Sequence, residues 1–203
     1  MTHYLYRDDL PEGIDFGSAV AIDTEAMGLH PHRDRLCLLQ FSAGDGDAHL
    51  VQFAPGCYAA PQLKRLLADP RVTKLFHFAR FDLAMIYHYL GVMALPVYCT
   101  KIASRLARTF TDRHGLRDLC KDLINVDLSK QQQSSDWGAE TLTEEQLRYA
   151  ASDVLHLHAL RGRLDAILAR EGREGLAGAC FDFLPHRVRL DLEGWAEQDI
   201  FAH

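Results

Sequence analysis

The sequence predicts an α/β domain in which a mixed β-sheet is flanked by helices. Short apolar runs rich in β-branched residues alternate with segments of helical periodicity. Two neighbouring runs, 35–42 and 48–52, are separated by the turn-rich sequence AGDGD, which predicts an antiparallel hairpin. At 203 residues, 48% of them hydrophobic, the chain can form one domain, residues 1–203, around a single core.

The individual elements follow from their patterns and end signals. We expect strands at 18–25, 35–42, 48–52, 72–78 and 97–98, and helices at 61–68, 79–90, 100–108 and 116–124. Pro70 follows the end of the first helix and Gly91 that of the second, since neither residue continues a helix well. The order of strands and helices is that of a sheet with helices packed on its faces.

A further helix begins near Thr143, because Thr143 and Gln146 have the spacing of a capping box. Apolar residues then recur at helical spacing as far as Leu168, so we expect this helix to continue that far. The preceding segment, 129–141, is polar and aperiodic, and we expect a loop close to the functional site. The tail, 171–203, spreads aromatic residues among charges; it either completes the core or contacts a neighbouring subunit.

Cysteine usage, hydropathy and charge limit the class of protein. The five cysteines form no C-x-x-C pair, so we expect reduced residues in a cytoplasmic protein and neither a disulfide framework nor a zinc site. No apolar run approaches membrane-spanning length, and the N-terminus lacks a secretory signal. The net charge of −6 disfavours a long nucleic-acid partner, but a substrate of a few nucleotides needs few phosphate contacts.

Four acidic residues lie in apolar stretches, where an unpaired carboxylate is costly: Asp23, Glu25, Asp82 and Asp153. Strand alternation places Asp23 and Glu25 on one face and Thr24 on the other. Two carboxylates so close repel each other unless a cation lies between them, and Mg²⁺ and Mn²⁺ prefer such oxygen ligands. The alternative is a strand end with two solvated acids.

The other two acidic residues lie on predicted helices. Asp82 falls in the first turn of its helix, where it either binds a metal or only interacts with the helix dipole. Tyr149 and Asp153 are four residues apart and therefore share one helix face. A tyrosine hydroxyl beside a metal-binding carboxylate can orient an attacking water; the alternative is a core tyrosine with a hydrogen-bonding partner.

The order D-x-E, then D, then Y-x-x-x-D resembles the DEDDy branch of the DnaQ-like 3′–5′ exonucleases, specifically the ribonuclease D group. The segments KLFHFARFD and KQQQSSDW, and the pattern L-T-x-x-Q-L-x-Y-A-A-x-D-V, carry the same resemblance, which covers about 15–170. Within this group, the compact length and the segment DTEAMGLHPHRDRLCLLQ are most similar to the nanoRNase C type, which degrades very short RNA. The resemblance implies an RNase H-like, DnaQ-type exonuclease fold.

The resemblance also implies a mechanism of phosphodiester hydrolysis with two divalent metal ions, Mg²⁺ or Mn²⁺. Asp23, Glu25 and Asp153 would hold one ion, and Asp23 with Asp82 the other. Tyr149 would position the nucleophilic water, so all five residues are catalytic in this interpretation. A free 3′-hydroxyl end would enter first and leave as a nucleoside 5′-monophosphate.

Five further residues are candidates for substrate binding: Met27, Gly28, Leu29, His77 and Trp137. By resemblance, His77 and Trp137 contact the terminal nucleotide or its phosphate; the alternatives are a satisfied histidine at a strand end and a loop anchor on the core. Leu29 would wedge between the two terminal bases, since stacking on apolar side chains tolerates any base. A buried core leucine is the competing interpretation.

Three functions remain open at this point. The first is an exoribonuclease that acts on single-stranded di- to oligoribonucleotides, and the second is a ribonuclease D-type enzyme that trims the 3′ ends of tRNA or other structured RNA. The third is an inactive nucleic-acid-binding scaffold. The nanoRNase C resemblance implies a homo-oligomer, a ring-shaped octamer, and no additional C-terminal helical RNA-binding domain is expected after the tail.

Overall fold

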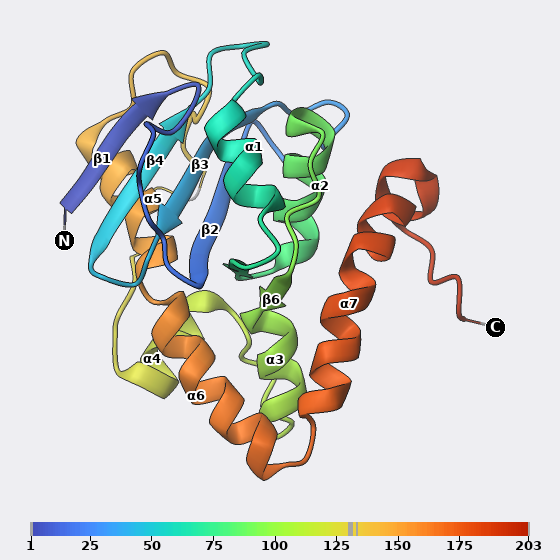
Figure 1. The fold of residues 1–203 in the computed structure, drawn as a ribbon. Helices are drawn as coiled ribbons and strands as arrows, with labels where there is room; N and C mark the ends of the chain where they lie inside the picture. Colours follow the sequence, from blue (N-terminus) through green and yellow to red (C-terminus); the bar gives the residue numbers. More distant parts are fainter. Residues whose placement is uncertain (1, 130–131, 133, 203) are drawn as a thin grey trace.

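The computed structural model describes residues 2–129, 132 and 134–202, which form a mixed sheet of six strands with helices on both faces (Figure 1). The strands are β1 (Thr2–Arg7), β2 (Ala19–Ala26), β3 (Leu36–Ser42), β4 (Asp47–Gln52), β5 (Thr73–Phe76) and β6 (Val97–Cys99). Their order across the sheet is β1-β4-β3-β2-β5-β6. The pairs β2–β3 and β3–β4 are antiparallel and the others are parallel. The predicted fold class and the hairpin are therefore confirmed.

The helices are α1 (Pro61–Ala68), α2 (Ala79–Leu90), α3 (Thr100–Ala107), α4 (Leu116–Ile124), α5 (Glu144–Leu155), α6 (Leu157–Arg170) and α7 (Glu174–Leu190), followed by a π-helical turn, η1 (Asp191–Trp195). Figure 1 shows α1 and α2 on one face of the sheet and α5 on the other. The larger apolar cluster includes Ile22, Leu39 and Leu83, whereas a smaller one joins the sheet to α5 through Leu38 and Ala150. The two faces of the sheet thus have separate apolar layers.

Strand β5 is shorter than predicted and ends at Phe76. Residues 77 and 78 leave the sheet, and Phe78 adopts a left-handed conformation, with φ of 72°, immediately before α2. This tight turn starts α2 beside the end of β2 and places Asp82 in its first turn, as predicted. Gly91 ends α2 in a left-handed conformation that favours glycine.

The prediction that one helix continues from Thr143 to Leu168 is wrong. The capping box is present, with the side chains of Thr143 and Gln146 each bonded to the backbone of the other. The helix then breaks at His156 into α5, which packs on the sheet, and α6, which packs on α3. Apolar spacing runs through the break because both helices bury one face, and the sequence contains no glycine or proline there.

Three elements were not predicted: β1, α7 and the π-helical turn η1. Strand β1 pairs in parallel with β4 at the sheet edge, and most of its side chains are exposed, so it lacks a buried apolar pattern. Helix α7 buries Ala177, Phe181, Leu184 and Val188 despite containing Pro185. The tail therefore contributes to the core, which answers part of the question that the sequence left open.

The predicted loop at 129–141 contains no helix or strand in its described residues, 129, 132 and 134–141; residues 130, 131 and 133 lie outside the described part of the chain. None of the helices among the described residues has both the length and the apolar character that a membrane span requires.

Candidate metal and nuclease site

Three carboxylates meet where β2 passes beneath α5. Asp23 and Glu25 lie on the same face of β2, and Asp153 on α5 lies close to both. One carboxylate oxygen from each of the three residues lies within 4.8 Å of the other two. Hard divalent cations prefer such sets of oxygen ligands, so the residues present fit a metal ion of this kind.

Asp82 reaches the same region from α2. Thr24 points away from Asp23 and Glu25, and its hydroxyl donates a 2.8 Å hydrogen bond to Asp82 Oδ1. The Asp82 carboxylate is only 2% exposed, and its charge raises the pKa of Asp23, so the two groups are electrostatically coupled. The structure thus brings Asp82 next to the cluster. Among the described residues, however, only Asp23, Glu25 and Asp153 form the group whose carboxylate oxygens lie within 4.8 Å of one another.

Burial and repulsion between neighbouring carboxylates both oppose the ionisation of the acidic residues at this site. Burial, followed by the charges of neighbouring carboxylates, raises the pKa of Asp23 and of Glu25 well above the ordinary range. Burial also raises the pKa of Asp82 and of Asp153 to about 7, although hydrogen bonds from Thr24 and Tyr149, respectively, lower it. A divalent cation would relieve this repulsion and lower all four pKa values.

Tyr149 lies one turn before Asp153 on α5, and its hydroxyl hydrogen-bonds to the Asp153 carboxylate. Burial and the charges of Asp153, Glu25 and Asp23 raise the pKa of Tyr149. The hydroxyl is therefore protonated at neutral pH and can orient a water molecule by hydrogen bonding, whereas it is a poor proton acceptor. The ring centroid of Trp137 lies 6.1 Å from that of Tyr149.

A cleft with a volume of about 720 Å³ opens above the cluster. It is lined by Asp23, Glu25, Tyr149 and Asp153 and by every predicted substrate-binding residue: Met27, Gly28, Leu29, His77 and Trp137. Leu29 is 77% exposed, so the alternative of a buried core leucine is wrong. Trp137, by contrast, is only 3% exposed and belongs to the apolar cluster that contains Leu38 and Leu147, so it anchors its loop as well as lining the cleft.

His77 has a defined hydrogen-bonding state. The Thr100 hydroxyl donates to the carbonyl of Phe76 (3.1 Å), so it accepts the 2.9 Å hydrogen bond from Nδ1–H of His77. Burial, with a smaller contribution from Lys101, lowers the pKa of His77 to about 3. The imidazole is therefore neutral, and its Nε2 is left as a hydrogen-bond acceptor beside the cleft.

Side chains that the sequence analysis missed hold the loop that carries Trp137. Arg35 donates to the carbonyl of Gly138 (3.0 Å), Gln52 to that of Ala139 (2.8 Å) and Gln146 to that of Asp136 (3.1 Å). These donors belong to three different parts of the fold, so no local spacing in the sequence indicates their shared role.

Two cations were also missed, Lys101 and Arg117, which line the cleft on α3 and α4. The ammonium of Lys101 lies 4.1 Å from the ring centroid of Phe78. Within the described residues neither cation forms an ion pair with a carboxylate, so both are available to an anionic ligand. Their local sequences show no motif that would have indicated this.

Comparison with known proteins defines the class. Residues 9–169 match the profile of a 3′–5′ exonuclease family, and the chain belongs to this family. It is 38% identical over 154 residues to ribonuclease D of Gluconacetobacter diazotrophicus, a match that covers 76% of this chain and 39% of the relative. The chain spans about two fifths of the length of such curated relatives.

Among solved structures, the chain is more similar to NrnC than to RNase D. Brucella melitensis NrnC with bound Mg²⁺ is 56% identical, with a TM-score of 0.96 and coverage of 100% of both chains. NrnC bound to pGG is 57% identical, with a TM-score of 0.97 over 100% of this chain and 99% of the other. Escherichia coli RNase D is 27% identical, with a TM-score of 0.74 over 84% and 45% of the two chains. The resemblance drawn from the sequence motifs is confirmed.

Proposed function

We propose that this chain is a 3′–5′ exoribonuclease that hydrolyses short single-stranded RNA, from dinucleotides to oligoribonucleotides, to nucleoside 5′-monophosphates in the cytoplasm. The observation that carries the proposal is the group of three carboxylates beside Tyr149 at the floor of a cleft. The ribonuclease D relatives and the NrnC structure bound to pGG support it.

The catalytic roles follow from the position of each side chain. Asp23, Glu25 and Asp153 would hold one divalent ion, Mg²⁺ or Mn²⁺, and Asp82 with Asp23 would contribute to a second. When bound, such ions stabilise the negative charge that develops on the phosphate during hydrolysis. The protonated hydroxyl of Tyr149 orients the attacking water toward the last phosphodiester bond.

Substrate binding is assigned to the lip and walls of the cleft. The exposed side chain of Leu29 wedges between the two terminal bases, with Met27 and Gly28 beside it. Trp137 supports the terminal nucleotide, and Nε2 of His77 accepts a hydrogen bond from a hydroxyl group of the substrate. None of these contacts reads a base edge, which suits an enzyme that removes any nucleotide.

Two features favour a short substrate. A cleft of about 720 Å³ has the size of a site for a small ligand, which corresponds to very few nucleotides. The net charge of −6 disfavours long-tract binding, while Lys101 and Arg117 supply positive charge within the cleft.

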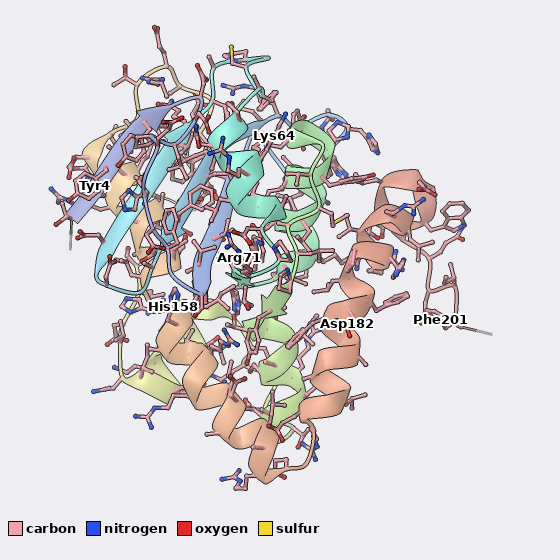
Figure 2. The ribbon with its side chains drawn as sticks, in the orientation of Figure 1. Tyr4, Lys64, Arg71, His158, Asp182 and Phe201 are labelled. Atoms are coloured by element: carbon pink, nitrogen blue, oxygen red, sulfur yellow. The ribbon has the colours of Figure 1, made fainter. Side chains whose placement is uncertain are left out.

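Replacing Lys101 with glutamine should lower kcat/KM for a dinucleotide about tenfold at low ionic strength and less in higher salt, because a phosphate contact is lost. Initial rates over a KCl series measure this effect. The matched control is Lys64→Gln on α1, on the face of the sheet opposite α5 (Figure 2), which should change nothing. A loss that is independent of salt would contradict the assignment.

Replacing Gly28 with alanine should raise KM about tenfold, because small displacements of positioning groups are costly. A Cβ atom at position 28 would clash with the Asp34 carboxylate, which accepts a hydrogen bond from the His30 amide (3.0 Å) and pairs with Arg33. Asp34 must then move, and with it the loop that carries Leu29. Steady-state kinetics with a dinucleotide test this, with Gly178→Ala, where a Cβ meets no atom within 4 Å, as control. An unchanged KM would contradict it.

The second candidate function is trimming of tRNA or other structured RNA 3′ ends, which the ribonuclease D relatives favour. It uses the same site and differs only in substrate length. An inactive scaffold is disfavoured, because such a protein has no need of three carboxylates positioned for a cation. Calorimetric titration with Mg²⁺ or Mn²⁺ separates a scaffold, which binds neither ion, from both enzymes.

We also propose that the chain forms a homo-oligomer, the octamer implied by the nanoRNase C resemblance. The C-terminal segment exposes Phe183, Trp195, Ile200 and Phe201, and Phe201 lies far from the sheet in Figure 2. Exposed apolar residues gathered in this way are typical of a contact surface. Light scattering after size-exclusion chromatography tests it, and a monomer would contradict it.

The direction of hydrolysis is tested with paired substrates. RNA with a free 3′-hydroxyl should be degraded from that end to 5′-monophosphates, whereas the same RNA with a 3′-phosphate should be resistant. Products are identified by chromatography. Release of 3′-monophosphates, or equal rates on both substrates, would contradict the proposed reaction.

A further inference from the structure

A fully buried glutamine lies beside the carboxylate cluster without a hydrogen-bonding partner. Gln40 is in the middle of β3, is 0% exposed, and lies directly opposite Asp23 in the antiparallel pairing of β2 and β3. Neither its Nε2 nor its Oε1 forms a hydrogen bond within the described part of the protein. Buried side-chain amides are rarely left without partners, so this one requires an explanation.

The neighbours of Gln40 restrict what it can bind. Residues opposite one another in an antiparallel pair have side chains on the same face, with Cβ atoms close together. On this face Gln40 has Leu50 opposite it on β4 and Leu38 two residues before it on β3. Ser42, two residues after it, already donates to the carbonyl of Asp47 (2.7 Å) and accepts from the amide of Gly44 (3.1 Å). Asp23 is therefore the polar group across the sheet that is in position to pair with Gln40.

The apolar residues around Gln40 give no structural reason for an amide side chain at this position. Leu38 and Leu50, on either side of Gln40, belong to the apolar layer under α5, and an apolar side chain of similar volume would extend that layer. A polar side chain placed in such a layer usually serves an interaction that the layer alone does not provide. For Gln40 the polar group in position to take part in such an interaction is the carboxylate of Asp23.

We propose that Gln40 is a positioning residue for metal binding: its Nε2–H donates a hydrogen bond to the Asp23 carboxylate when that carboxylate holds a divalent ion. The bond would hold the Asp23 carboxylate in one orientation on β2. Partners of this kind orient metal ligands, and their loss typically lowers metal affinity about 10- to 100-fold. The inference rests on the proposed function, because it requires a divalent ion at Asp23.

The test is the variant Gln40→Met, which keeps the volume and removes both polar atoms. Titration calorimetry of the full chain with Mn²⁺ should show an affinity about 10- to 100-fold lower than in the unsubstituted chain. The melting temperature in the presence of a chelator should be unchanged or higher, because the substitution removes a buried polar group without partners. The matched control is Leu67→Met on α1, an equally buried position in the other apolar layer; it should leave the affinity for Mn²⁺ unchanged.

The outcomes separate the inference from the proposed function. If the unsubstituted chain binds neither Mn²⁺ nor Mg²⁺, the proposed function fails and the inference fails with it. If it binds and Gln40→Met binds equally well, only the inference fails. A Gln40→Met protein that is unfolded, or clearly less stable with chelator present, would also contradict the inference, because it would show that the amide supports the metal-free fold.

Discussion

Replacing Asp153 with asparagine should abolish hydrolysis of short RNA while leaving the chain folded. Asp153 is one of three carboxylates that converge within 4.8 Å, and it also hydrogen-bonds to Tyr149. The substitution removes a charged metal ligand and alters the group that holds the tyrosine hydroxyl. We expect at least about a 10³-fold loss of kcat/KM, which corresponds to about 4 kcal/mol of transition-state stabilisation.

The measurement is the rate of dinucleotide hydrolysis with Mg²⁺ or Mn²⁺, together with the melting temperature in a chelator. Asp182→Asn is the matched control, because Asp182 is exposed on α7, away from the layer formed by the sheet and α5 (Figure 2). The control should keep full activity. Retention of more than about a tenth of the activity by Asp153→Asn would contradict the assignment of the site.

Without divalent ions, the contribution of the four carboxylates to the stability of the chain should fall as the pH rises from about 4 to about 7. His77, whose pKa is lowered to about 3, contributes in the opposite direction over this range, so the carboxylate contribution is the difference between the chain and its Asp23→Asn variant. Burial raises the pKa of Asp82 and of Asp153 from the ordinary 3.8 to about 7, and those of Asp23 and Glu25 also rise. At these carboxylates the folded chain therefore binds more protons than the unfolded chain within this window, so their contribution to the free energy of unfolding decreases with pH. For Asp82 and Asp153 this contribution is fully present below about pH 4 and is lost as the pH rises through about 7.

Divalent ions should reverse this trend, since they bind the ionised carboxylates. The increase in melting temperature caused by Mg²⁺ should be larger at about pH 8 than at about pH 5.5. Thermal denaturation with chelator or Mg²⁺ at a series of pH values measures both effects, and Asp23→Asn should flatten both. A difference in melting temperature in chelator between the chain and Asp23→Asn that does not change over this range, or an Mg²⁺ effect that does not depend on pH, would contradict the electrostatic account.

The sequence was sufficient to predict the parts of the site that depend on local periodicity. Alternation along β2 places Asp23 and Glu25 on one face, and the four-residue spacing on α5 places Tyr149 next to Asp153. The capping box at Thr143 fixed the start of α5. Patterns of this kind span only a few consecutive residues, so they can be recognised in the sequence without knowledge of the fold.

Features that depend on the pairing of distant segments were missed. The position of Gln40 opposite Asp23 follows from the register of β2 and β3, and the contacts of Arg35 and Gln52 with the Trp137 loop join residues 103 and 87 positions apart in the sequence. The break at His156 was missed for a related reason, because it is set by what α5 and α6 pack against. Periodicity gives the buried side of a helix, but it does not say which element covers that side.

The most direct test of the central claim is the hydrolysis of 5′-labelled RNAs of two, three, seven and twenty nucleotides with Mn²⁺ or Mg²⁺, beside Asp153→Asn. The cleft and its two cations predict the highest rate on the dinucleotide, a lower rate on each longer RNA, and no turnover by the variant. A rate on the twenty-nucleotide RNA that equals or exceeds that on the dinucleotide would contradict the proposed short substrate and favour the trimming of longer RNA.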